Sequence, residues 1–322
     1  MSALTLEAQQ VASAVEQLAA VGWPVGLGIL AASLAAFFIA VVPSWRRWTE
    51  PALWTLTAVL LAGEVLLAWF HWSVWSAAGI LDPSGAVVVG RVAVPLWVES
   101  EKLYVWAIAV AVMTLFVRRM RGEMLPPLTA VTAALATGAV LIGQPFAAPL
   151  PQFLGQWQGY VEALGSGVPQ GAQGAFQGMM GAATYYYNAW FMWVHPPLLF
   201  ISYGAFVVSF VASALMIVRR RSSYEAVAYG WAKIGYLALT LGMLLGFPWA
   251  LMSWTGEAWW WSGKVNMSVM MWLVYTAYLH GRLYLRRRGM WKVVAALAIL
   301  AFVALVLTYV TTYVVPGAHS VA

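Results

Sequence analysis

The sequence predicts an all-α protein: a polytopic membrane helix bundle of about eight transmembrane helices, with both termini on the outer side. Three observations predict this class. Of the 322 residues, 63% are hydrophobic and 9% are charged, whereas a water-soluble domain carries roughly 25% charged residues. Apolar runs of about 20 residues, long enough to cross a bilayer, recur along the chain. Basic residues follow every second run. We expect a single integral domain over residues 1–322, in the cytoplasmic (inner) membrane.

The apolar runs give the expected boundaries of the helices. The chain opens with residues 1–23, which contain Glu7 and Glu16 and no basic residue. This composition favours a short amphipathic lead-in over a cleavable signal. The spans then follow at 24–43, 51–75, 93–117, 126–149, 188–218, 229–253, 265–285 and 290–315.

Clusters of arginine predict the orientation of these helices. Positive residues favour the cytoplasmic side of a membrane protein. The clusters are Arg46 and Arg47; Arg118, Arg119 and Arg121; Arg219, Arg220 and Arg221; and Arg286, Arg287 and Arg288. They follow alternate spans, so segments 82–92, 150–187 and 254–264 are expected outside. The second of these is a Gly/Gln-rich loop, a lid or a spacer, and the third is a tryptophan-rich loop.

Composition also excludes several kinds of chemistry. The chain has no cysteine, which excludes disulfides, thiolate metal sites and the Cys-x-x-Cys-His attachment of a c-type haem. The net charge of +6 arises from basic residues beside the membrane spans. We therefore expect no nucleic-acid partner.

Four histidines are present, and their depths differ. His195 lies near the outer end of its span, where Pro196 and Pro197 remove two backbone donors and are expected to open the helix locally. His319 follows the last span, and His71 lies close to the outer surface. His280 lies roughly 22 Å below the tryptophan-rich loop, at 1.5 Å per residue. Each histidine, taken alone, is also compatible with an ordinary interhelical hydrogen bond.

The histidines together with the aromatic residues favour a haem site. Neutral imidazole is a common metal ligand, but a cage built only from protein groups fits poorly with so few acids and no cysteine. A planar cofactor that needs one or two axial imidazoles and aromatic walls fits better. We therefore expect non-covalent, b-type haem. The predicted iron ligands are His195, His319 and His280, and His71 is a further candidate for cofactor contact.

Three segments carry a family resemblance. They are "HPPLLFISYGAFVVSFVASAL", "WWWSGKVNMSVMMWLVYTAYLH" and "GAHS", which contain His195, His280 and His319. In this order, over about residues 186–322, they resemble the cytochrome c assembly family, the CcsA/CcmC/CcmF group of haem-handling membrane proteins. The resemblance implies that His195 and His319 are the outer histidines flanking the tryptophan-rich loop. It also implies that His280 occupies the place of the membrane-embedded haem ligand.

The tryptophan-rich loop departs from that family. Members usually read Trp-x-Trp-Asp-Pro followed shortly by an acid, whereas this chain reads Trp-Trp-Trp-Ser-Gly-Lys over residues 259–264. The core that holds haem is compatible with this change, while the surface that presents haem to an apocytochrome is expected to differ. The predicted aromatic contacts to haem are Trp254, Trp259, Trp260, Trp261 and Trp272. The alternative is that these rings are interfacial anchors.

Acidic residues inside the spans are functional candidates by default. Glu64 can pair with an arginine, bind a propionate through a cation or relay protons, or it can be protonated and hydrogen-bonded between helices. Glu101 and Lys102 are expected to form a local charge pair. The alternative is a quinol site that includes Glu99, because quinol oxidation needs a proton acceptor.

Two functions remain open, with a third less favoured. The first is a haem-binding protein of the cytochrome c assembly type, with other membrane subunits and an outer c-type cytochrome or apocytochrome as partners. The second is a b-type haem electron-transfer subunit of a respiratory complex, with quinol as a further partner. The altered loop favours the second, because a permanent cofactor needs no delivery surface. A transporter without cofactor leaves the order of the histidines unexplained.

Overall fold

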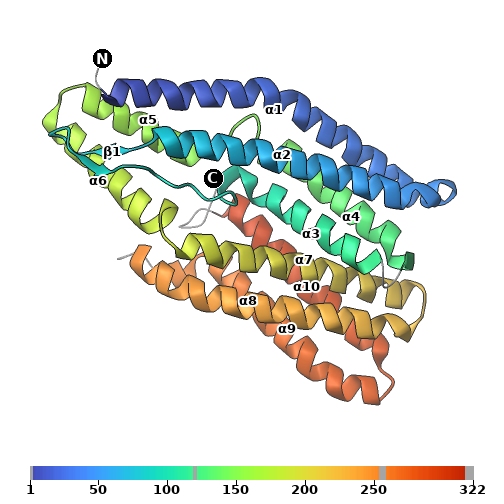
Figure 1. Ribbon diagram of the computed structural model, residues 1–322. Coiled ribbons are helices and arrows are strands. Elements are labelled where there is room, and N and C mark those ends of the chain that lie inside the picture. Colours follow the sequence, from blue (N-terminus) through green and yellow to red (C-terminus); the bar gives the residue numbers. More distant parts are fainter. Residues whose placement is uncertain (1–2, 119–121, 254–258, 316–322) are drawn as a thin grey trace. The chain divides into compact units, whose positions relative to one another are not determined.

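The computed structural model describes residues 3–118, 122–253 and 259–315, and most of this part of the chain is helical (Figure 1). The long helices in sequence order are α1 (Ala3–Val41), α2 (Thr49–Ala77), α3 (Lys102–Arg118), α4 (Leu125–Gly138), α5 (Pro151–Gly165), α6 (Pro169–Ala182), α7 (Phe191–Val218), α8 (Glu225–Ser253), α9 (Gly263–Arg287) and α10 (Trp291–Val314). The predicted all-α membrane class is confirmed.

Seven helical segments in the described ranges are long and apolar enough to cross a membrane: Leu6–Val41, Pro43–Ala77, Glu99–Arg118, Gly122–Gly143, Phe191–Val218, Ser222–Ser253 and Trp291–Thr311. The expected eighth span, 265–285, corresponds to α9. Its length suffices, but its composition includes Lys264, His280 and several arginines, which lower its mean hydropathy. The count of eight and the outer position of both termini stay predictions.

Two segments expected outside the regular spans differ from expectation. Residues 3–23 are not a separate lead-in, because α1 continues through Pro24 as one helix. The Gly/Gln-rich segment 150–187 is not a loop. It forms α5 and α6, which begin at Pro151 and Pro169, and then one π-helical turn, η5 (Ala183–Tyr187). Proline at the first helical position explains both starts, because its fixed φ suits that position and its missing N–H costs nothing there.

The chain divides into two compact units, each assembled from separate stretches. Unit 1 contains Met1–Ile39, Glu50–Ile108 and Thr132–Trp193; unit 2 contains Ala40–Thr49, Ala109–Val131 and Val194–Ala322.

Unit 1 carries a small hairpin between α2 and α3. Strands β1 (Ile80–Leu81) and β2 (Val87–Val89) pair antiparallel. Asp82 organises the turn by accepting hydrogen bonds from the Ser84 hydroxyl and from the backbone N–H groups of Ser84 and Ala86. The Ser84 hydroxyl and then the Ala86 N–H hold the pKa of Asp82 below its usual value. Tyr160 of α5 bonds both the N–H and the carbonyl of Leu81, so the hairpin is fastened to α5.

The start of α7 shows how the chain accommodates Pro196. A proline has no N–H for the carbonyl four residues earlier, here that of Met192. The indole Nε1 of Trp97 donates to that carbonyl at 2.6 Å, within unit 1. The Trp97 ring also contacts Trp193 edge-on at 5.6 Å. The expected opening of the helix does not occur, because α7 remains α-helical through both prolines.

Close helix packing in unit 2 depends on small residues in α8. A Cβ added to Gly235 would lie 2.6 Å from the Phe206 ring of α7. The Phe206 ring also stacks on Tyr275 of α9, with ring centroids 3.6 Å apart. Small residues let helix backbones approach closely inside a membrane. Phe206 therefore links three helices around one glycine.

Gly63→Ala should destabilise unit 1. The new Cβ would lie 2.2 Å from the Tyr104 hydroxyl and 3.0 Å from the Phe146 ring, and Tyr104 is held by its bond to the Leu60 carbonyl. Such overpacking costs roughly 1–3 kcal/mol. We expect a lower midpoint of thermal unfolding in detergent. Gly28→Ala is the control, since its Cβ meets nothing within 4 Å; equal midpoints for the two variants would contradict the packing.

Trp97→Phe should also lower the unfolding midpoint, because it keeps an aromatic ring and removes the donor to Met192. An unpaired buried carbonyl costs roughly 1–3 kcal/mol. Trp190→Phe is the matched control, because the Trp190 side chain is 57% exposed. If Trp97→Phe is no less stable than this control, another group satisfies the Met192 carbonyl.

Candidate functional site

His195 is held in a defined orientation in unit 2. Its Nδ1 lies 2.6 Å from the carbonyl oxygen of Gly242 in α8. A carbonyl only accepts hydrogen bonds, so Nδ1 carries the proton. Nε2 is then the unprotonated nitrogen, and it has no hydrogen-bond partner among the described residues. Trp249 lies alongside, with ring centroids 6.0 Å apart.

Two glycines make room for this ring. A Cβ on Gly246 would lie 2.6 Å from Cε1 and 2.8 Å from Nδ1 of His195, and one on Gly242 would lie 2.8 Å from Leu199. The imidazole therefore lies directly on the backbone of α8. Lys264, at the start of α9, interacts electrostatically with His195 and places a positive charge near the ring.

The three consecutive tryptophans form a short 3-10 helix, η7 (Trp259–Trp261), with unequal exposure. Trp259 is buried and contacts Phe247 of α8 edge-on at 5.5 Å. Trp260 is 50% and Trp261 74% exposed. Trp259 and Trp260 meet edge-on at an interplanar angle of 67°, so these two rings are not stacked on each other. One ring anchors the turn, and two remain available on the surface.

The other candidates on α9 are placed differently. Trp272 donates from Nε1 to the Thr240 hydroxyl and stacks on Tyr236, so it contributes to packing against α8. His280 is exposed, and its Nδ1 donates to the Thr276 carbonyl of its own helix at 2.9 Å. The Nε2 of His280 has no hydrogen-bond partner among the described residues.

Trp254 and His319 lie outside the described residues. The structure therefore gives no contact for the second predicted outer ligand or for the first tryptophan of the loop.

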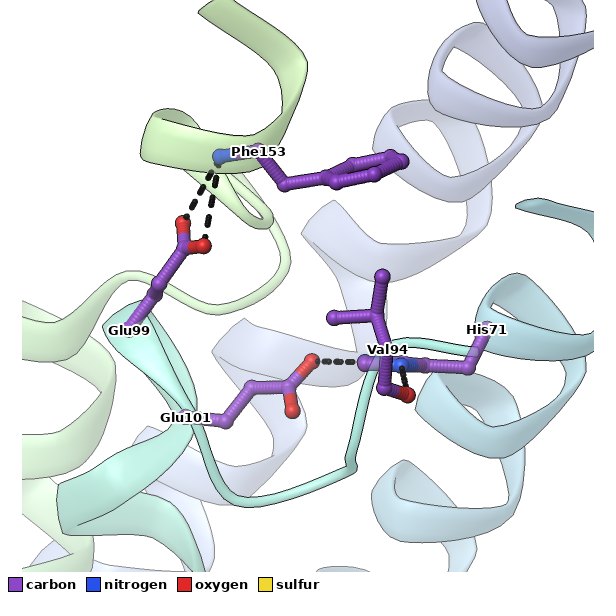
Figure 2. A network of polar contacts seen from close by, with 5 residues as sticks. All are labelled: His71, Val94, Glu99, Glu101 and Phe153. Atoms are coloured by element: carbon purple, nitrogen blue, oxygen red, sulfur yellow. Dashed lines mark hydrogen bonds and ion pairs between the residues drawn. The ribbon is translucent and has the colours of Figure 1, made fainter. Parts of the chain in front are cut away.

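His71 belongs to unit 1 and is fully engaged there (Figure 2). Its Nδ1 donates to the Val94 carbonyl at 2.8 Å, and its Nε2 lies 2.6 Å from Oε1 of Glu101. Both side chains are buried, with exposures of 7% and 0%. In this arrangement neither ring nitrogen is left to bind iron. The partner of Glu101 is thus a histidine from α2, whereas the sequence suggested its neighbour Lys102.

Glu99 points away from Glu101 and caps α5 (Figure 2). Its carboxylate accepts hydrogen bonds from the N–H groups of Gln152 and Phe153 and from the Tyr187 hydroxyl. These amides belong to the first turn of a helix, which has no internal acceptors for them. Burial, followed by the charge of Glu99, raises the pKa of Tyr187. Glu99 has a φ of 49°, a left-handed conformation that lets the short turn η2 (Glu99–Glu101) send its two carboxylates to different partners.

Several residues of these sites were not predicted. The two glycines that pack against His195 occur in the sequence Gly242-Met-Leu-Leu-Gly246. This small-xxx-small pattern is typical of close helix contacts in membranes. The role of Trp97 becomes visible only once its indole is known to lie beside the Met192 carbonyl. The cap on α5 had no sequence signal, because Glu99 and Phe153 are far apart in the chain.

Comparisons with known proteins agree with the resemblance in the sequence. Residues 96–319 match the family described as "Cytochrome C assembly protein". The cytochrome c-type biogenesis protein CycK of Bradyrhizobium diazoefficiens is 36% identical over 113 residues, which are 34% of this chain and 17% of CycK. The cytochrome c-type biogenesis protein CcmF of Escherichia coli is 37% identical over 112 residues, again 34% of this chain and 17% of the relative.

A solved structure, that of "Cytochrome c Heme Lyase CcmF", matches the fold. The TM-score is 0.52 at 20% sequence identity, over 96% of this chain and 47% of that chain. The chain thus spans less than half of that protein, and its aligned part covers less than a fifth of each curated relative above. The apolar helices and these relatives make it a multi-pass protein of the cytoplasmic membrane. Because the family match covers more than half of its length, this chain belongs to the cytochrome c assembly protein family.

Proposed function

We propose that this protein serves cytochrome c assembly by holding haem non-covalently, with Nε2 of His195 as an axial ligand of the iron. The hydrogen bond between Nδ1 of His195 and the Gly242 carbonyl carries the proposal. A histidine that binds a metal commonly donates its other ring N–H to a carbonyl, which fixes the tautomer and the ring orientation. His195 already has that second bond.

The donor set suits haem better than a bare metal ion. Among the described residues, no group of three or more His, Cys, Asp or Glu side chains is arranged to hold a metal ion. Haem needs only one or two axial protein ligands, because the porphyrin nitrogens supply the others. His319 is the proposed second ligand, as the family resemblance implies.

The residues beside His195 support the same proposal. Trp260 and Trp261 are exposed aromatic surfaces, and a porphyrin can contact such rings in offset or edge-on arrangements. The positive charge of Lys264 lies near His195 and would favour a haem propionate. Bound haem would supply the porphyrin that becomes attached to apocytochrome c on the outer side. Because the relatives are longer, we propose that other membrane subunits complete the reaction.

The alternative is a b-type haem subunit that exchanges electrons with quinol. The observation that favours it is the Trp-Trp-Trp-Ser-Gly-Lys sequence, which lacks the acid and proline of the family pattern. Stoichiometric haem reducible by quinol, without a cytochrome c maturation defect on deletion, would select this alternative. A maturation defect with haem retained on the protein would select assembly.

His195→Ala should abolish or alter the haem, since the iron loses an axial imidazole. His319→Ala tests the second ligand in the same way. Gly246→Ala should act similarly without removing the ligand, because its Cβ would lie 2.6 Å from Cε1 of His195. The measurement is the optical spectrum of the purified protein with pyridine haemochrome analysis.

Gly230→Ala on the same helix is the control, since its Cβ meets nothing within 4 Å. An unchanged low-spin spectrum in both His195→Ala and Gly246→Ala would contradict the proposed ligand. Absence of haem from wild-type protein gently purified from haem-replete cells would contradict haem binding as a whole.

His280→Ala should leave the His195-dependent spectrum intact and remove any separate inner haem. The reason is depth, since α9 carries His280 roughly 22 Å along its axis from the tryptophan turn. Difference spectra of the single variants and of the double variant with His195→Ala measure this. Identical spectral losses in the two single variants would show that both residues serve one haem.

A further inference from the structure

Unit 1 contains a buried polar cluster that the proposed haem site does not use. Its members are His71 and Glu64 on α2 and Glu101 in η2. Glu64 interacts electrostatically with both other groups. One carboxylate oxygen of each glutamate, Oε2, is buried and has no hydrogen-bond partner in the described part of the chain. Two unpartnered acceptors in one buried cluster need a donor that the residues described by the structure do not supply.

The His71–Glu101 contact must contain a proton. Nδ1 of His71 already donates its hydrogen to the Val94 carbonyl. The 2.6 Å contact between Nε2 and Oε1 therefore requires a further hydrogen, either on Nε2 or on the carboxyl. In either form the pair is neutral overall, so it cannot balance the charge of another acid.

Glu64 is the group left without compensation. Glu64 lies within the candidate span Pro43–Ala77, and among the described residues His71 is the one basic side chain that interacts with it. The Tyr104 hydroxyl is already committed to the Leu60 carbonyl. An ionised carboxylate in such surroundings is costly unless it is paired.

The remaining charged groups of this region are matched to one another. Glu99 accepts hydrogen bonds from the first turn of α5 and from Tyr187, and Lys102 interacts electrostatically with Glu99. The interactions of Glu64 are with His71, Glu101 and Tyr104. The cluster also differs from a metal site, since no set of three or more ligating side chains in the described ranges is suitably placed.

We infer that Glu64, beside the neutral His71–Glu101 pair, is a proton-binding site within the membrane. Its ligand is a proton delivered by hydronium or by a hydroxyl-bearing molecule. An O–H bond forms on the Glu64 carboxylate as the donor's O–H bond breaks, and the reverse step releases the proton. Glu101 is completely enclosed, whereas Glu64 is partly accessible, so Glu64 is the member that exchanges. The inference is independent of haem.

The test is infrared spectroscopy of the full chain in nanodiscs, which detects the C=O stretch of a protonated carboxyl. At neutral pH the wild-type protein should show this band, and transfer to D2O should shift it because the proton exchanges. Glu64→Gln should lose the Glu64 component of this band, measured as the difference from the wild-type spectrum. Glu162→Gln should keep it, since Glu162 is an exposed acid on α5 outside the candidate spans.

Each outcome decides the inference. A wild-type protein without the band at neutral pH, or a folded Glu64→Gln variant whose band is unchanged from wild type, overturns the assignment. Loss of the band in Glu101→Gln but not in Glu64→Gln would place the proton on the other acid and also overturns it. If Glu64→Gln does not fold, Glu64→Asp must change the band frequency while keeping a band. None of these results depends on haem, so they leave the haem proposal unaffected.

Discussion

Polar groups that a chain carries into a membrane must find their partners within the protein, because lipid offers none. Much of the detail in both units follows from this constraint. Pro196 leaves the Met192 carbonyl without its helical donor, and Trp97 replaces that donor. The Gly242 carbonyl receives a second hydrogen, from His195. In each case one polar side chain serves the backbone, and the backbone in turn fixes that side chain.

This constraint explains how the candidate haem ligand acquires its orientation. A histidine on an isolated helix can rotate, and either nitrogen can carry the proton. Here the glycines at 242 and 246 bring the backbone of α8 against the ring, and a carbonyl selects the Nδ1–H tautomer. The tryptophans at the start of α9 differ, because only Trp259 is anchored by packing. Trp260 and Trp261 remain exposed.

The helical membrane class could be predicted from hydrophobicity, because each membrane span is one continuous apolar run of the sequence. Helix α9 illustrates the limit, since it is as long as a span but carries basic residues. The prediction of a loop over 150–187 is wrong because Pro151 and Pro169 start helices there despite the glycine and glutamine content of the segment. For the site, the order of the histidines and the tryptophan content indicate His195. Its tautomer and its packing against Gly246 depend on α8, which is distant in sequence. The contact of Trp97 with the Met192 carbonyl likewise joins residues far apart in the chain. His71 was also a candidate from the sequence. The structure shows that both of its ring nitrogens are hydrogen-bonded, one to the Val94 carbonyl and one to Glu101.

The turn η2 carries two acids that bind different helices, α5 and α2. Its first acid holds the N-terminus of α5, and its last acid holds His71. Only Ser100 lies between the two acids. The left-handed backbone conformation at Glu99 further restricts this short segment. Pulling on α5 would therefore apply tension to the turn that positions Glu101.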